Sequence, residues 1–178
     1  KKEGRYTDIS WKEMQRMVTN LGLGLISLGV EKDDIVTIFS ENCWQWLVAD
    51  LASLSIGAAD APIYATNSGE EAAYIINDSG SRFLFVSDQD HLNRVLGVKS
   101  TLKGLKKIIT FDPISAGDKD IISLDEVIKL GEEYKRHVIA TTDQEAGTLI
   151  RIARQERLRT FYVPRGVGGR FSVLSPVG

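Results

Sequence analysis

The C-terminal end of the chain holds residues whose types and spacing could do chemistry. Gly168, Gly169 and Arg170 lie in "VPRGVGGRFSVLSPVG", after the short apolar run "TFYV" at 160–163. Glycines allow backbone conformations and close approaches that a side chain would prevent. An arginine on a loop after a strand has a permanent charge and a planar set of donors, which suit a developing oxyanion such as an enediolate. A tight turn whose arginine points into water fits the same spacing equally well.

Other candidate residues favour structural roles. His91 and His137 are the only histidines, and neither has a neighbouring cysteine or a His-x-x-x-His spacing, which argues against a zinc site. We expect His91 to be exposed near a helix start and His137 to open a strand. The glycines of "GLGLIS" at 22–27 fall inside a predicted helix rather than after a strand, and no G-x-x-x-x-G-K-[ST] pattern occurs, so no phosphate loop is expected.

The overall composition narrows the classes of partner. The 22 basic and 24 acidic residues nearly cancel, so no charge excess favours nucleic acid or anionic lipid, and small neutral or anionic ligands remain open. Cys43 is the single cysteine, which suits a reducing, cytoplasmic setting. No apolar stretch approaches the roughly 20 residues of a membrane span. Because the chain starts at Lys1 and stops inside a motif, we expect a fragment; its oligomeric state does not follow from the sequence.

Helix-forming patterns recur along the chain. From Ser10 onward, apolar residues three or four apart form the stripe of an amphipathic helix: Trp11, Met14, Val18, Leu21 and Leu25. Capping boxes mark four helix starts, at Ser10 with Glu13, Ser68 with Glu71, Ser123 with Glu126 and Thr142 with Glu145. A helix over 43–57 is apolar on most sides, and we expect it to be deeply buried.

Short apolar runs rich in β-branched and aromatic residues predict buried strands. They lie at 35–39, 82–87, 107–111, 137–141 and 160–163. Because helix-length segments separate them, we predict an α/β fold of alternating βα units, with a mainly parallel sheet and helices on both faces. Residues 112–123 carry Pro, Gly and alternating charges, which indicates a solvated loop.

From about Tyr6 to Tyr134 the sequence resembles the N-terminal portion of the long-chain acyl-CoA synthetases, which are AMP-binding, adenylate-forming ligases. The likeness runs through "GLISLGVEKDDIVTIFSENCWQWLVADLASLSIGAADAPIYATNSGEEAAYIINDSGSRFLFVSD", "LKGLKKIITFD" and "SLDEVIKLGEE". The family's "ENRPEW" is "ENCWQW" here, a change at a helix start. The complete family uses ATP, Mg²⁺ and coenzyme A, but its Pro-Lys-Gly phosphate loop does not follow this region. The resemblance therefore implies no cofactor for this chain.

From about Lys135 to Gly178 the sequence resembles glucose-6-phosphate isomerase, through "HVIATTDQEAGTLIRIARQERLRTFYVP" and "VGGRFSVLSPVG". By this resemblance Arg170 takes the place of the arginine that stabilises the enediolate, and Gly168 and Gly169 supply the substrate-binding backbone around it. Arg165 departs from the acidic or amide residue usual there. The family's glutamate base, its ring-opening histidine and most of its phosphate-binding loop have no counterpart in the chain.

Two segments are therefore predicted, a ligase fragment at 1–134 and an isomerase fragment at 135–178, acting on the small-molecule substrates of those families. Whether the chain is an enzyme stays open, because neither active site is complete. The alternatives are an isomerase portion that needs a complementary chain and a non-catalytic α/β binding module. The 44 residues of the second segment are too few for a core of their own. The sequence does not distinguish a natural join from an engineered or an assembly-derived one.

Overall fold

The computed structural model describes residues 8–114 and 118–142 of the 178-residue chain. The chain divides into two units, Lys1–Lys135 and Arg136–Gly178, and of the second unit only the part up to residue 142 is described.

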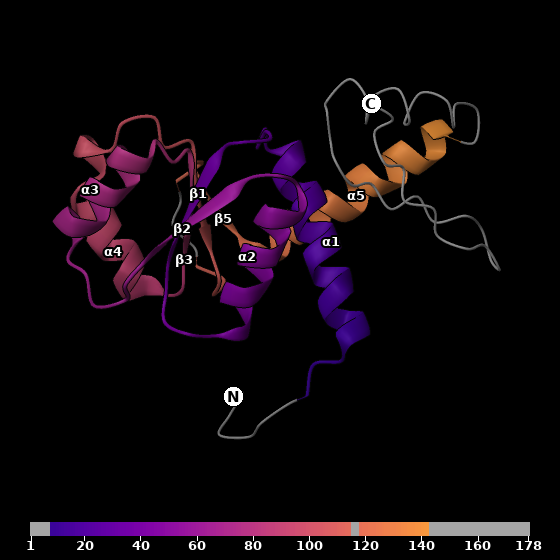
Figure 1. The fold of residues 1–178 in the computed structure, drawn as a ribbon, viewed down its shortest axis with the longest axis horizontal. Helices are drawn as coiled ribbons and strands as arrows, with labels where there is room; N and C mark the ends of the chain where they lie inside the picture. Colours follow the sequence, from indigo (N-terminus) through magenta and orange to yellow (C-terminus); the bar gives the residue numbers. More distant parts are fainter. Residues whose placement is uncertain (1–7, 115–117, 143–178) are drawn as a thin grey trace, which may run out of the picture. The chain divides into compact units, whose positions relative to one another are not determined.

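Five parallel strands form one sheet in the order β2-β1-β3-β4-β5 (Figure 1). The strands are β1 (Ile35–Phe39), β2 (Ala59–Ile63), β3 (Phe83–Val86), β4 (Lys107–Thr110) and β5 (Ile121–Ser123). Helices alternate with the first four strands, since parallel neighbours require a crossover connection. The predicted α/β fold with a parallel sheet is confirmed.

The sheet carries helices on both faces, as expected (Figure 1). Residues of α1 (Trp11–Ser27), α2 (Trp44–Ser55) and α5 (Leu124–Thr142) join one apolar cluster, and residues of α3 (Gly69–Ser79) and α4 (Gln89–Gly97) join the other. A short 3₁₀ turn, η1 (Lys99–Thr101), follows α4. Along β3, Phe83 and Phe85 enter the first cluster while Leu84 and Val86 enter the second. Burial on both faces explains why the central strands are continuous apolar runs.

The helix starts at Ser68 and Ser123 are capping boxes, as predicted. The Ser68 backbone N donates to Glu71 Oε2 over 2.8 Å, and the Glu71 backbone N donates to Ser68 Oγ over 3.2 Å. Ser123 and Glu126 exchange the same two bonds over 2.9 and 3.3 Å. Ser10 accepts from the Glu13 backbone N over 3.2 Å. These bonds satisfy amide donors that the first helical turn leaves unpaired.

The strand predicted at 137–141 is wrong, because these residues belong to α5, which continues to Thr142. His137 is therefore helical, and Thr142 is the last residue of a helix rather than an N-cap. The β-branched residues of "HVIAT" favour a strand by intrinsic propensity, but no proline interrupts the helix that begins at Leu124. The strand predicted at 160–163 lies outside the described residues.

Neither edge strand, β2 or β5, was predicted from the sequence. The strand β2 reads "ADAPI" and contains Pro62, which a sheet tolerates on an edge strand. The strand β5 lies within 112–123, which was predicted to be a loop. Edge strands have only one paired neighbour and are partly exposed, so their sequences carry a weaker apolar signal than those of central strands.

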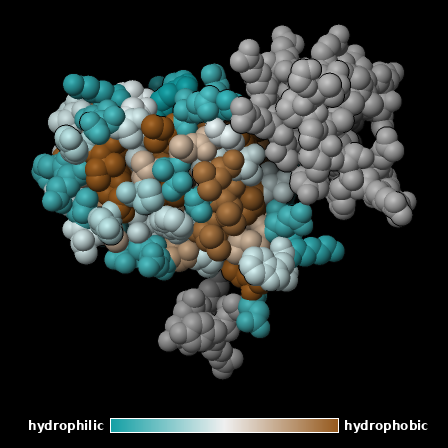
Figure 2. All heavy atoms as spheres, viewed as in Figure 1, coloured by the Kyte–Doolittle hydropathy of each residue, from teal (hydrophilic) through white to brown (hydrophobic). Residues whose placement is uncertain are grey.

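The helix α2 is less buried than predicted. Leu47, Leu51 and Leu54 are between 38% and 51% exposed, and Figure 2 shows an apolar patch over α2. These three leucines lie four and three positions apart, so they share the face of the helix that points away from the sheet. Trp11, which was expected to begin the buried stripe of α1, is 84% exposed. The buried part of that stripe includes Leu21 and Leu25.

The helices α1 and α5 approach each other at backbone distance. A Cβ atom on Gly131 would lie 1.8 Å from the Asn20 carbonyl oxygen, and one on Gly24 would lie 2.1 Å from the Val127 carbonyl oxygen. Beside this contact, Glu132 Oε1 accepts from Arg16 Nη1 over 3.1 Å and from Asn20 Nδ2 over 3.0 Å. The glycines are required because the obstructing atoms belong to the backbone and cannot rotate away.

We predict that Gly131→Ala lowers the free energy of unfolding by about 1–3 kcal/mol, the usual cost of forcing extra atoms into a packed contact. Urea denaturation of the full chain measures the change. Gly97→Ala is the matched control, because a Cβ atom there meets no atom within 4 Å and alanine is the better helix former. Equal stability of the Gly131 variant and the parent would contradict the close packing of α1 on α5.

Candidate functional site

Three loops meet at the carboxyl edge of the sheet. Ser40, Glu41 and Asn42 follow β1, residues 64–67 follow β2, and Ser87 follows β3. Since β1 pairs with β2 on one side and with β3 on the other, the sheet grows in both directions from β1. Open parallel sheets bind ligands at the carboxyl ends of the strands, at the point where strand order reverses. This edge is therefore the candidate site.

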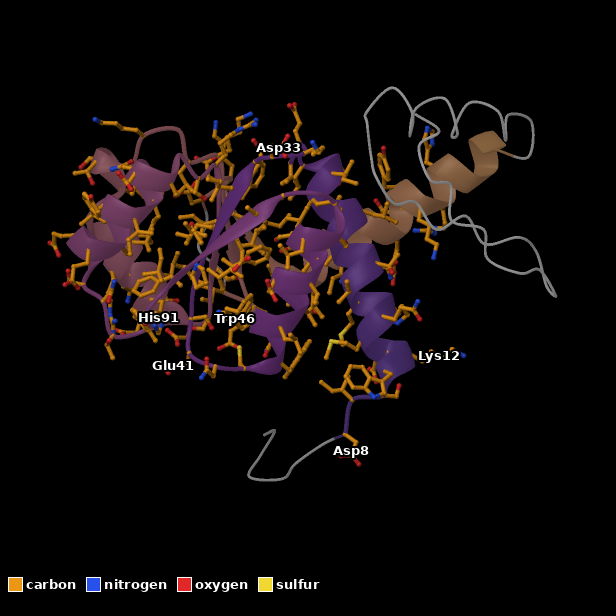
Figure 3. All side chains as sticks on the ribbon, in the orientation of Figure 1. Asp8, Lys12, Asp33, Glu41, Trp46 and His91 are labelled. Carbon is orange, nitrogen blue, oxygen red and sulfur yellow. The ribbon has the colours of Figure 1, made fainter. Side chains whose placement is uncertain are left out.

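A hollow of about 540 Å³ lies between the loops that follow β1 and β2. Its volume falls within the range of small-molecule sites, roughly 300–1,000 Å³. Glu41, Trp46 and His91 lie at this edge of the sheet, while Asp33 lies at the opposite edge (Figure 3). The lining residues are Ser40, Glu41, Asn42, Trp46, Pro62, Ile63, Tyr64, Ala65 and Thr66.

His91 is buried, which corrects the expectation that it is exposed. Its side chain is 5% exposed and lies edge-on to the ring of Phe39 at 4.6 Å between centroids. The ring nitrogen Nδ1 lies 2.8 Å from Asp88 Oδ1, and Nε2 lies 3.1 Å from the Ala65 carbonyl oxygen. Both partners are acceptors. The imidazole therefore links the start of α4 to the loop after β2, a link between residues 26 positions apart.

Arg94 makes the second connection between α4 and this loop. Its Nη1 donates to the carbonyl oxygens of Ala65, over 2.8 Å, and Asn67, over 3.1 Å. Its Nη2 donates to the carboxylate of Asp90 one turn earlier in the helix. Ala65 belongs to the wall of the hollow, so His91 and Arg94 together position that wall. We call residues 64–67 with these two side chains the clamped loop.

Asp88 is the N-cap of α4 and the anionic partner of His91. Its Oδ1 accepts from the His91 backbone N over 3.0 Å, and its Oδ2 accepts from Ser87 Oγ over 2.9 Å. Partial burial raises the pKa of Asp88, but the hydrogen bonds from the backbone and ring of His91 and from Ser87 outweigh it and lower the pKa to about 2. The carboxylate is thus ionised throughout the physiological range. The spacing of Asp88 before His91 is an N-cap signal that the sequence analysis did not use.

Ser87, Asp88 and His91 are the residue types of a hydrolytic triad, but their geometry is different. Ser87 Oγ and Asp88 Oδ1 both approach the same ring nitrogen, Nδ1, at 3.1 and 2.8 Å. In a triad the hydroxyl and the carboxylate contact opposite nitrogens, so that one of them can take the nucleophile's proton. Here Nε2 already faces a backbone carbonyl. The cluster is therefore a structural clamp and not a proton-transfer device.

A second pair of titratable groups lies on α2 and β2. Burial raises the pKa of Asp50, and the charge of Asp60 and a hydrogen bond with it raise the pKa further. Two carboxyl groups in contact favour holding one proton between them. The pair lies near the beginning of β2 and away from the carboxyl edge, so it does not contribute to the hollow.

The described side chains that line the hollow include no cationic group for a nucleotide phosphate. None of the described residues that line the hollow is a lysine or an arginine. Within 8–114 and 118–142, no group of three or more histidine, cysteine, aspartate or glutamate side chains could hold a metal ion. Gly168, Gly169 and Arg170, the site residues predicted from sequence, lie outside the described residues. Their predicted role therefore stays a prediction.

The fold and its site define a class, an open parallel α/β domain with a small-molecule hollow at the carboxyl edge. The chain belongs to the AMP-binding enzyme family, whose model matches residues 2–146. It is 34% identical over 107 residues to the long-chain-fatty-acid–CoA ligase FadD15 of Mycobacterium bovis, covering 60% of this chain and 18% of that protein. Against fatty acyl-CoA synthetase A of Dictyostelium discoideum it is 29% identical over 129 residues, covering 72% and 19%. The chain thus spans about a fifth of the length of these ligases.

Solved ligase structures share the fold. The anthranilate CoA ligase AuaEII, solved with anthranoyl-AMP, superposes with a TM-score of 0.64 at 20% identity, covering 69% of this chain and 23% of that one. Coronafacic acid ligase from Pectobacterium brasiliense gives a TM-score of 0.64 at 23% identity, with 69% and 25% covered. These similarities establish the arrangement of the sheet and helices.

The chain is also similar in sequence to glucose-6-phosphate isomerase. The isomerase of Thermus thermophilus is 37% identical over 116 residues, covering 61% of this chain and 27% of that protein. The ligase and isomerase matches must overlap, because residues 2–146 leave too little chain outside them to hold 61% of it. The segment boundary after residue 134 stays a prediction. No helix in the described part of the chain is long and apolar enough to cross a membrane.

We predict that Asp88→Asn lowers the free energy of unfolding at pH 7 by about 0.5–1 kcal/mol, the scale of a partly exposed charge contact. The pKa of Asp88 is lower in the folded state, so its charge stabilises the fold above the unfolded pKa near 3.8. This contribution is lost as the pH falls towards 2. Urea unfolding of parent and variant from pH 7 downward measures the difference. The exposed Asp112 gives the control variant, Asp112→Asn, and a pH-independent loss for Asp88→Asn would contradict the assignment.

We predict the opposite effect for Asp50→Asn. A pKa raised by folding stabilises the fold only at low pH, and this contribution is lost as the pH rises through the folded value. At pH 7 the ionised Asp50 beside Asp60 opposes folding. The variant should therefore gain about 0.5 kcal/mol, a rise in Tm of about 1–3 °C by calorimetry. The gain should shrink towards pH 4, and Asp125→Asn at the exposed start of α5 should show none. A lower Tm for Asp50→Asn would refute the repulsion.

Proposed function

We propose that the chain is the N-terminal part of a long-chain acyl-CoA ligase, joined near residue 134 to a segment related to glucose-6-phosphate isomerase. We further propose that the chain alone catalyses neither reaction and is a fragmentary or chimeric protein of the cytoplasm. The observation that carries the ligase assignment is the family match over residues 2–146, within a chain that spans only 18% of the M. bovis ligase.

The inactivity follows from what each reaction requires. Adenylate formation from an acid and ATP needs cationic groups at the phosphates, and the described residues that line the hollow include no lysine or arginine. Aldose–ketose isomerisation needs a base that carries a proton between two carbons, as well as a group that stabilises the enediolate. Arg170 would supply the second function only. A complete ligase of this family would use ATP, Mg²⁺ and coenzyme A, and the binding groups for them would lie in other parts of such a protein.

A second candidate function rests on the 37% identity to the T. thermophilus isomerase. In this alternative the chain is an isomerase portion that becomes active with a complementary chain, in which Arg170 stabilises the enediolate and Gly168 and Gly169 bind substrate. A third candidate, a non-catalytic α/β binding module, rests on the hollow at the carboxyl edge.

The test is an assay of the full 178-residue chain for both parent reactions. We expect no pyrophosphate–ATP exchange with a long-chain fatty acid, no acyl-CoA formation with coenzyme A added, and no isomerisation of fructose 6-phosphate. Exchange above background would show that the ligase portion is catalytically complete. Isomerisation that Arg170→Ala abolishes would establish the second candidate in place of the first.

The proposed join has a separate test. Sequencing unamplified DNA across codons 125–145 should give continuous reads if the fusion is a real gene. Reads that separate at this point would show that the two segments were brought together during assembly of the sequence.

A further inference from the structure

The hollow at the carboxyl edge combines two aromatic side chains, one carboxylate and an apolar wall. Trp46 is half-buried and packs against the core cluster of α1 and α2, which fixes its ring. Tyr64 is 83% exposed at the other side of the hollow, and the exposed ring of Pro62 supplies hydrocarbon between them. Tryptophan and tyrosine rings attract cations through the negative potential of their faces.

The side chains that line the hollow carry a net negative charge. Glu41 is the one charged residue among the described residues that line the hollow. The arginine that contacts the wall, Arg94, lies on α4 and pairs with Asp90. The N-terminus of α2 beside the hollow contributes only about half an elementary positive charge, so the full charge of Glu41 leaves the lining negative. A carboxylate or phosphate ligand would be repelled and an ammonium group attracted.

The wall of the hollow is held in place before any ligand arrives. The Ala65 carbonyl oxygen accepts from Arg94 over 2.8 Å and lies 3.1 Å from His91 Nε2, so α4 holds the clamped loop. On the side of β1, Ser40 is 6% exposed and its Oγ donates to the Glu41 carbonyl oxygen over 2.7 Å. A preorganised site binds with a smaller loss of conformational entropy.

We propose that this hollow is a binding site for an alkylammonium ligand, a primary amine with a hydrocarbon body. Trp46 and Tyr64 contact the cationic head, Glu41 supplies the opposite charge, and Pro62 contacts the hydrocarbon. This site is independent of the adenylate-forming and isomerising activities of the parent families, because its charge disfavours their anionic groups.

The test compares three six-carbon probes that share a tail and differ in the head group: hexylammonium, hexanol and hexanoate. The indole N–H signals of ¹⁵N-labelled full chain report binding near Trp46, with the exposed Trp11 as an internal control for non-specific contact. Trp46→Phe assigns the signal. At pH 7 and low salt we expect hexylammonium to bind about five- to tenfold more tightly than hexanol, from the combined cation–π and ion-pair contributions. Hexanoate should bind most weakly.

Glu41→Gln should remove most of the preference for hexylammonium over hexanol while hexanol binding stays unchanged. Glu41 is exposed, so the variant should keep the parent Tm. Glu31→Gln, an exposed change before β1 at the opposite edge, is the matched control and should keep the preference. Equal binding of hexanol and hexylammonium, tighter binding of hexanoate, or no shift of the Trp46 signal with any probe would each overturn the proposal.

Discussion

The position of β1 between β2 and β3 is the constraint on which the candidate site depends. The loop after β1 leads to α2 on one face of the sheet, and the loop after β2 leads to α3 on the other face, so these two loops diverge at the carboxyl edge. The space between them is the hollow. His91 and Arg94 support the loop after β2 through one carbonyl oxygen, that of Ala65, to which Arg94 donates and beside which His91 Nε2 lies at 3.1 Å. The helix α4 thus holds the loop after β2, and this loop forms one wall of the hollow.

Much of the fold could be predicted from the sequence because its central strands are buried on both faces. The runs at 35–39, 82–87 and 107–111 are mostly apolar rather than alternating, a pattern typical of strands covered by helices on both sides. The edge strand β2 could not be predicted, because "ADAPI" lacks the pattern and its pairing depends on a neighbour 24 residues earlier. The run "HVIAT" at 137–141 was predicted to be a strand, but it is helical. Its residues favour a strand intrinsically, but helix α5 continues through them.

The candidate site was harder to predict, because its decisive contacts involve backbone atoms. A carbonyl oxygen such as that of Ala65 has no signature in the sequence, and its partners lie 26 and 29 residues further along the chain. From the sequence, His91 was expected to be exposed, whereas its side chain is 5% exposed. A histidine whose two ring nitrogens both face fixed acceptors is bound in place, and it has no free nitrogen for proton transfer. The same residue types therefore stabilise the site without reacting in it.

The exposure pattern of α5 gives a physical reason why two unrelated sequences could meet near residue 134. Leu124 and Val127 are buried in the first apolar cluster, and Gly131 is buried against α1. The first two positions therefore require apolar residues, and position 131 requires glycine. From residue 133 to residue 137 every side chain is exposed. Gly131 and Glu132 contact α1, whereas residues 133–137 are exposed, so core packing constrains residues 133–137 less than the preceding part of the helix. The proposed join near residue 134 falls in this exposed part, where a substitution costs least in packing.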